Sequence, residues 1–267
     1  MAHKQGSWEK PNFKVVHVIA AVLATATLLM FLYLWRIFYP VSDWAIIFLL
    51  ALAFLVFAAV FSPTASKYRA RLRIEINETS PLSGWLTGRI HAGFVALAFT
   101  GVAMPVLAWQ ALTASWAEVM GFIALSVVSG SVMLRLYIWL GSHLSAWLAR
   151  SAAITLAACA VGLIFIPLII WINWGYAAHP GGIRIATLSQ AVMISIDELP
   201  SRRGWIAEML SFFYALDGAK LWLVVQLSPS RWATILYSLD ASLVGFIVAK
   251  ASAFLASFIS NKIEGLK

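Results

Sequence analysis

The sequence contains few charged residues and a single cysteine. Only 11% of its 267 residues are Asp, Glu, Lys or Arg, whereas about a quarter of the residues are charged in soluble domains. Hydrophobic residues make up 62% of the chain, which excludes a water-soluble globule and predicts a multi-pass membrane protein. The lone Cys159 excludes an internal disulfide, a cluster held by several cysteines and a CxxC redox pair.

Acidic residues are the scarcer charged type. The chain has 11 Asp and Glu against 19 Lys and Arg, a net charge of +8. In a membrane protein this excess is first explained by topology, because Lys and Arg are retained on the cytoplasmic side during insertion. The charge therefore does not predict nucleic-acid binding.

The motifs of common enzymes are also missing. The sequence has no HExxH, no GxSxG and no Walker lysine, which are the signatures of zinc peptidases, serine hydrolases and P-loop NTPases. The adjacent carboxylates Asp197 and Glu198 fall in a polar segment, where a solvated or capping role is expected. We therefore predict that the protein is not an enzyme.

Long apolar runs predict an all-α, polytopic transmembrane bundle. Seven runs are long enough to cross about 30 Å of hydrocarbon, namely residues 15–39, 44–61, 90–112, 117–140, 152–174, 205–227 and 233–259. We predict seven spans in one integral membrane domain, residues 1–267. The alternative is six spans, with residues 205–216 forming an interfacial helix followed by a re-entrant piece. Seven spans put the carboxyl terminus outside, whereas six put it inside, which Lys262 and Lys267 favour.

Basic residues set the predicted orientation. Segment 63–89 is predicted to be a basic cytoplasmic loop, because it holds Lys67, Arg69, Arg71, Arg73 and Arg89. The amino terminus, with three lysines, is then also cytoplasmic, as in a protein of the inner (cytoplasmic) membrane, and residues 175–204 form an external loop. Residues 67–76 alternate polar and apolar types, which predicts a strand.

Several charged residues fall within the predicted spans. They are Asp217, Lys220, Asp240, Lys250 and Arg135. A charge at mid-bilayer costs roughly 2.5 to 3.5 kcal/mol, so such residues usually face a protein interior and have a partner. Asp217 and Lys220 are three residues apart and can pair on one helix face. Lys250 needs another partner, and Arg135 is near enough to the cytoplasmic end to snorkel.

Small residues recur at every fourth position of the last run. They are Ala241, Gly245, Ala249, Ala253 and Ser257. Such stripes allow two helix backbones to approach closely in lipid. We therefore predict that the last helix packs tightly, against partner subunits or a second copy.

Sequence patterns indicate two candidate cofactors, haem and retinal. Arg89-Ile90-His91 followed by Thr100-Gly101 is similar to the start of a haem-bearing helix in membrane cytochromes b, and a pair drawn from His17, His91 and His143 would hold at most one haem b near the cytoplasmic surface. No other metal site is predicted.

Residues 231–253, from Arg231-Trp232 through Val248-Ala249-Lys250-Ala251-Ser252-Ala253, resemble the last helix of heliorhodopsins. The resemblance implies that Lys250 forms a Schiff base with retinal, in a photoreceptor with a cytoplasmic amino terminus. The segment Arg89-Ile90-His91-Ala92 lacks the carboxylate counterion expected in the third helix, and the long loop between the first two helices of that family is absent.

These observations favour a non-enzymatic membrane subunit that packs into a larger assembly of the secretion, conjugation or energy-transducing type. Its predicted partners are membrane lipid and other membrane subunits or a second copy, with no nucleic acid. The alternatives are a retinal-binding photoreceptor that uses Lys250 and a small transporter subunit.

Overall fold

The structure is all-helical over the residues it describes. It is a computed structural model that describes residues 15–75, 88–176, 187–200, 204–226 and 231–264, without the side chains of 73–75, 169–170, 172–176, 231–242 and 264. The elements are α1 (Val15–Phe38), the 3-10 turn η1 (Asp43–Ala45), α2 (Ile46–Glu75), α4 (Arg89–Thr113), α5 (Trp116–Gly141), α6 (Ala146–Tyr176), α7 (Leu188–Asp197), α8 (Trp205–Gln226) and α9 (Arg231–Glu264).

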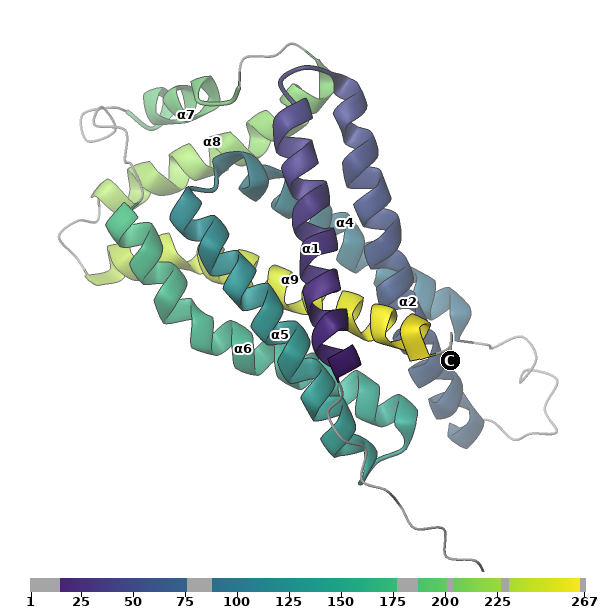
Figure 1. Ribbon diagram of the computed structural model, residues 1–267. Coiled ribbons are helices and arrows are strands. Elements are labelled where there is room, and N and C mark those ends of the chain that lie inside the picture. Colours follow the sequence, from purple (N-terminus) through teal and green to yellow (C-terminus); the bar gives the residue numbers. More distant parts are fainter. Residues whose placement is uncertain (1–14, 76–87, 177–186, 201–203, 227–230, 265–267) are drawn as a thin grey trace, which may run out of the picture.

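Six of these helices, α1, α2, α4, α5, α6 and α9, are long and apolar enough to cross a membrane. The protein is therefore a polytopic membrane helical bundle. Helix α8 has 22 residues but does not meet the same criterion, because it carries Glu208, Asp217 and Lys220. It runs across one end of the bundle with α7 beside it (Figure 1). The structure thus agrees with the six-span alternative and corrects the prediction of seven spans.

Two connecting segments contain helix that the sequence patterns do not predict. Helix α2 continues to Glu75, so residues 67–75 are helical and the strand prediction is wrong. A helix satisfies its backbone hydrogen bonds internally, whereas a strand needs a neighbouring strand to pair with. Within residues 175–204, the short helix α7 begins with a capping box in which Thr187 and Gln190 each accept a hydrogen bond from the other's backbone N–H.

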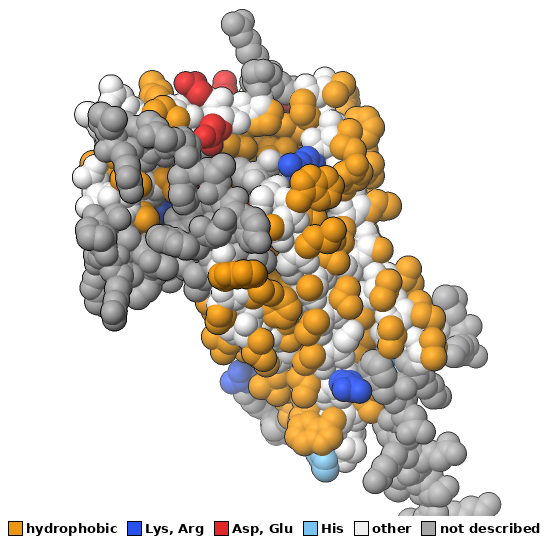
Figure 2. Space-filling model, turned by 60° about the vertical axis from the view of Figure 1, so that its left-hand side comes forward, with side chains coloured by type: hydrophobic (Ala, Val, Ile, Leu, Met, Phe, Trp, Pro, Cys, Tyr) orange, Lys and Arg blue, Asp and Glu red, His pale blue; other side chains and the backbone are white. Residues whose placement is uncertain are grey.

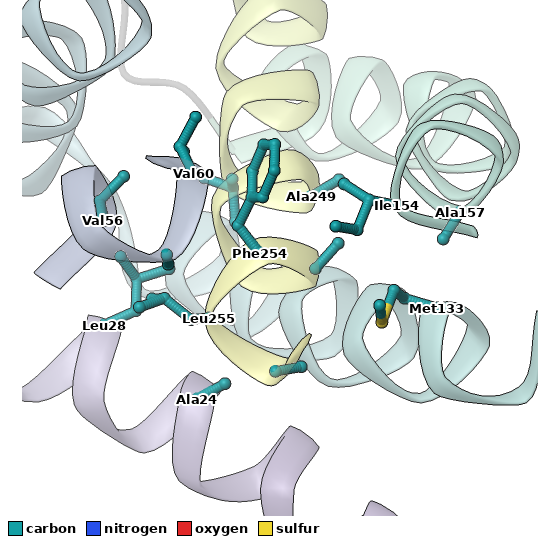
Figure 3. Close-up of a cluster of buried hydrophobic side chains, with 14 of the residues drawn as sticks. Ala24, Leu28, Val56, Val60, Met133, Ile154, Ala157, Ala249, Phe254 and Leu255 are labelled. Carbon is teal, nitrogen blue, oxygen red and sulfur yellow. The ribbon is translucent and has the colours of Figure 1, made fainter. Parts of the chain in front are cut away.

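Helix α9 is the central helix of the bundle. It contacts α1, α2, α4, α5, α6 and α8. In its most apolar stretch 72% of the residues are buried, against 28–44% in the corresponding stretches of the other five spanning helices. Figure 3 shows Leu255 and Phe254 of α9 in the core, with Leu28 of α1 and Val60 of α2 nearby. The other spans each bury one side against α9 or its neighbours and leave apolar side chains exposed on the other, as helices bordering lipid do.

The start of α1 and the end of α9 lie at the same end of the bundle, as six alternating crossings require. Arg150, near the start of α6, donates hydrogen bonds to Asn261 near the end of α9 and to Tyr137 near the end of α5. The guanidinium also lies 5.2 Å from the centre of the Tyr137 ring. These contacts tie α5, α6 and α9 together at this end.

Over the residues that the structure describes, the two ends of the bundle differ in charge. The end of the bundle at which α2 and α5 finish is called the basic end. Its described charged side chains are Lys67, Arg69, Arg71, Arg89, Arg135, Arg150 and Lys262. We call acidic end the opposite one, whose described carboxylates are Asp43, Glu118, Asp197, Glu198, Glu208 and Asp217. Figure 2 shows acidic side chains near one end of a largely hydrophobic face, with a basic side chain close to them, and further basic side chains with a histidine near the other end.

Candidate functional site

The small-residue stripe of α9 lies inside the bundle. Gly245, Ala249, Ala253 and Ser257 are all buried, while the side chain of Ala241 is outside the described residues. Their surroundings are helices of the same chain, because α9 contacts five other spans and α8. The prediction that this stripe contacts another subunit is therefore corrected: the described part of the stripe packs within the chain and is covered.

A chain of buried hydroxyl groups joins α1, α5 and α9. The Thr25 Oγ1 lies 3.0 Å from the Ser126 Oγ, which lies 2.6 Å from the Ser252 Oγ. One turn further along α5, the Ser129 hydroxyl donates to the backbone carbonyl of Ala249 at 2.7 Å. Because every one of these hydroxyls has a partner, the chain stabilises the helix contacts without leaving an unpaired polar group in the core.

The same three helices approach closely at Gly130 of α5. A Cβ atom at this position would lie 3.1 Å from the Cβ of Ala21 on α1 and 3.3 Å from that of Ala256 on α9. Only a glycine fits this spacing without movement of its neighbours. The hydroxyl chain and Gly130 together form a three-helix junction. Sequence patterns do not reveal it, because the residues that α1, α5 and α9 contribute are more than 100 positions apart.

The charged pair on α8 forms as its spacing predicts. The Lys220 Nζ lies 2.8 Å from the Asp217 Oδ1, and the two side chains are 23% and 29% exposed. Among the described side chains, no Asp, Glu, Lys or Arg is fully buried. The pair lies part-buried at the acidic end.

Lys250 is half-buried and lies against an aromatic ring. Its Nζ is 5.3 Å from the centre of the Phe99 ring, a distance at which the ring face attracts the ammonium group. No described carboxylate forms an ion pair with it. Arg135 is exposed on α5, which is compatible with snorkelling, and the side chain of Asp240 lies outside the described residues.

Helix α8 has two apolar faces, of which one is buried and one exposed. Its inward face packs against the ends of α1 and α4 in a cluster with Trp35, Tyr39 and Ala108. The outward face carries large apolar side chains that are 44–61% exposed, namely Trp205, Met209, Phe212, Leu216 and Leu223. These positions are three, four or seven apart and lie on one side of a helix. We call this set the α8 stripe.

Helix α7 packs closely on α8 near the charged pair. A Cβ atom at Gly218 would lie 2.6 Å from the Ser195 hydroxyl and 2.8 Å from the Ala191 carbonyl. Glu198 follows α7, and partial burial, together with the nearby Asp217 carboxylate, raises its pKa. Burial also raises the pKa of Tyr214 on the inward face of α8. Close packing therefore places the acidic side chains of α7 and α8 near one another.

The structure brings together no metal site among the residues it describes, where no group of three His, Cys, Asp or Glu side chains is close enough to bind an ion. His91 packs edge-on against Tyr68 with 4.0 Å between ring centres, and His143 packs against Trp139. His17 is buried at the start of α1. Two of these histidine rings thus pack on aromatic side chains near the basic end.

No protein family matches the chain, and comparison with curated proteins and with solved structures also finds no match. The class of protein is therefore defined by the helices themselves, as a multi-pass integral membrane protein.

Proposed function

We propose that the protein is a non-enzymatic subunit of a larger membrane assembly, and that a helix of a different subunit binds the α8 stripe. The observation that carries the proposal is the exposed apolar face of α8, a helix that lies across the bundle end and is too polar to be a span. Exposed apolar patches bordered by polar residues are typical of protein contact sites.

The surroundings of the α8 stripe define the partner further. Glu208 is exposed on the same helix, and among the described residues of the acidic end the six carboxylates outnumber Arg36 and Lys220. A partner helix with an apolar face and flanking Lys or Arg residues would complement both features. By the positive-inside rule the basic end faces the cytoplasm, so this partner would bind on the external side of the membrane.

The test is a paired substitution on the α8 stripe. Met209→Ser with Phe212→Ser removes two exposed apolar side chains one turn apart without touching the inward face of α8. We expect native gels of the natively expressed protein in mild detergent to lose the larger complex, with the free subunit increasing at least about fivefold. The reason is that central aromatic contacts carry about 2 kcal/mol or more of binding energy, and 1.4 kcal/mol is a factor of ten.

The matched control is Phe94→Ser with Leu97→Ser on α4. These side chains are 70% and 64% exposed and have the same spacing, but they lie on a spanning helix where lipid is expected. The control should leave the complex intact. A wild-type protein that runs only as a monomer, a complex that contains only copies of this chain, or an equal loss in both variants would each overturn the proposal.

A retinal-binding photoreceptor is a second candidate, favoured by the position of Lys250. The residue lies within the central helix, half-buried against Phe99, and an aromatic surrounding of this kind suits a retinal chain. Retinal supplied during expression should then give a visible or near-ultraviolet absorption band that disappears in Lys250→Ala. A colourless protein under these conditions would exclude the Schiff base.

The third reading, a small transporter subunit, has less support. Transport needs a polar path through the bundle, whereas the buried polar side chains of the described core are His17 and hydroxyl groups. The hydroxyls of the three-helix junction bond to one another or to a backbone carbonyl.

A further inference from the structure

An apolar cavity opens between α1, α4 and α5 near the acidic end. Its volume is about 450 Å³, which is within the usual range of about 300–1,000 Å³ for small-molecule sites. The inner part is lined by aliphatic and aromatic side chains such as Leu28, Leu107 and Phe122, with Val248 contributed by α9. This lining suits a hydrocarbon chain and offers nothing to hold a polar ligand at depth.

The cavity extends along α1 from Ala26 to Arg36. Ten residues of helix correspond to about 15 Å, which is half the ~30 Å thickness of a bilayer's hydrocarbon core. The cavity thus has the depth of one lipid leaflet. Its long axis follows a spanning helix, so an acyl chain of a neighbouring lipid could enter it without turning.

The polar groups of the cavity lie at its outer end. Arg36 is in the last turn of α1, and its Nη1 donates a hydrogen bond to the backbone carbonyl of Ala114 at 3.0 Å. That bond positions the guanidinium and uses one of its five N–H donors. Tyr33, Gln110 and Trp116 complete this rim, and such amphipathic aromatic side chains are typical of the headgroup level.

Arg36 also has no carboxylate partner among the described residues. Its remaining donors are directed by the planar fork of the guanidinium, which matches the geometry of a phosphate group. A cation at headgroup level above a cavity of leaflet depth complements a ligand that joins a phosphate to an acyl chain.

We propose that this cavity is a specific binding site for an anionic phospholipid, with one acyl chain between α1, α4 and α5 and the phosphate on Arg36. The ligand belongs to the leaflet at the acidic end. A single arginine holds the phosphate of that ligand, and burial of the acyl chain against the apolar lining supplies the rest of the affinity.

The experiment is native mass spectrometry of the full-length protein titrated with phosphatidylglycerol or with phosphatidylcholine. Wild type should bind one phosphatidylglycerol about tenfold more tightly than phosphatidylcholine, because the choline ammonium of phosphatidylcholine offsets the phosphate charge beside the guanidinium, and a tenfold difference corresponds to about 1.4 kcal/mol. Arg36→Gln should abolish this preference, and Arg36→Lys should retain part of it. Lys67→Gln, which removes an exposed charge at the basic end, should leave it unchanged.

A second pair of variants tests the cavity itself. Ala26→Phe adds a ring from the cavity wall and should weaken binding of both lipids, whereas Ala98→Phe, at an exposed α4 position outside the cavity, should weaken neither. Melting temperatures of all variants identify any that fail to fold, and the comparison is then made with Arg36→Lys. Equal affinity for the two lipids in wild type, a preference that survives Arg36→Gln, or displacement of the lipid by millimolar inorganic phosphate alone would overturn the proposal.

Discussion

Ser126 of α5 and Ser252 of α9 lie with their hydroxyl oxygens 2.6 Å apart at the centre of the bundle, although 126 residues separate them in the sequence. The Ser252 hydroxyl also lies within hydrogen-bond distance of the Val248 carbonyl of its own helix, at 2.8 Å. The pair thus connects the central helix to its neighbour through side chains that are both buried. This contact is a direct target for mutation.

Ser126→Ala should destabilise the protein by roughly 1 kcal/mol. The substitution removes the middle member of the hydroxyl chain and leaves Thr25 without its partner on α5, and hydrogen bonds between membrane helices contribute about 0.6 kcal/mol on average and at most about 1.7. Thr155→Ala is the matched control, because this exposed hydroxyl bonds only to its own helix. Thermal unfolding in detergent measures both, and equal stabilities would contradict the role of the chain.

Gly130→Leu should destabilise the bundle by about 1–3 kcal/mol, the usual cost of overpacking a core. Even the Cβ atom would press on Ala21 and Ala256, and a longer side chain forces α1 or α9 to move. Gly101→Leu on α4 provides the control, because nothing lies within 4 Å of a Cβ atom there. If the two leucine variants unfold at the same temperature, the close approach at Gly130 has no energetic consequence.

Glu198 predicts a pH dependence of stability. Its pKa is raised in the folded protein by partial burial and by Asp217, so the folded state holds the proton more tightly than the unfolded state does. Stability from this group is present below the unfolded pKa of about 4.3 and is lost as the pH rises through the folded pKa. Glu198→Gln should therefore raise the melting temperature slightly at pH 7 and leave it unchanged at pH 4. Glu208→Gln removes the same charge from an exposed site on α8, and an equal rise there would assign the effect to net charge instead.

Six spans predict that both termini lie on one side of the membrane. In a Cys159→Ser background, single cysteines placed near either end of the chain should be protected from an impermeant thiol reagent in intact cells. A cysteine at the exposed Met193 of α7 should react, because α7 follows an odd number of crossings. Labelling of the carboxyl-terminal cysteine in intact cells would restore the seven-span topology.

Local patterns predicted the helical parts of this fold well. The apolar runs predicted the six spanning helices, apart from the extension of α2 to Glu75, and the three-residue spacing of Asp217 and Lys220 predicted their ion pair. Both features depend on neighbours within one helix, which the sequence displays directly. The polar character of residues 205–227 left six and seven spans open, and the structure resolves the choice in favour of six.

Contacts between distant segments were the part that the sequence could not supply. The stripe of small residues on α9 indicated a close contact with another helix. The composition of the stripe does not say whether that helix belongs to another subunit or to the same chain, as α5 and α6 do. Thr25, Ser126 and Ser252 are ordinary hydroxyl residues in apolar runs, and only the fold brings them together. The cavity at Arg36 likewise requires three helices to converge.

The central position of α9 has a consequence for biogenesis. The last span to leave the ribosome is the one around which the other five are arranged, so the earlier helices enter the bilayer before the core that unites them exists. We therefore expect that lipid or an insertion factor occupies the place of α9 during synthesis, and that a chain truncated before Arg231, which lacks this scaffold, is degraded faster than the full chain.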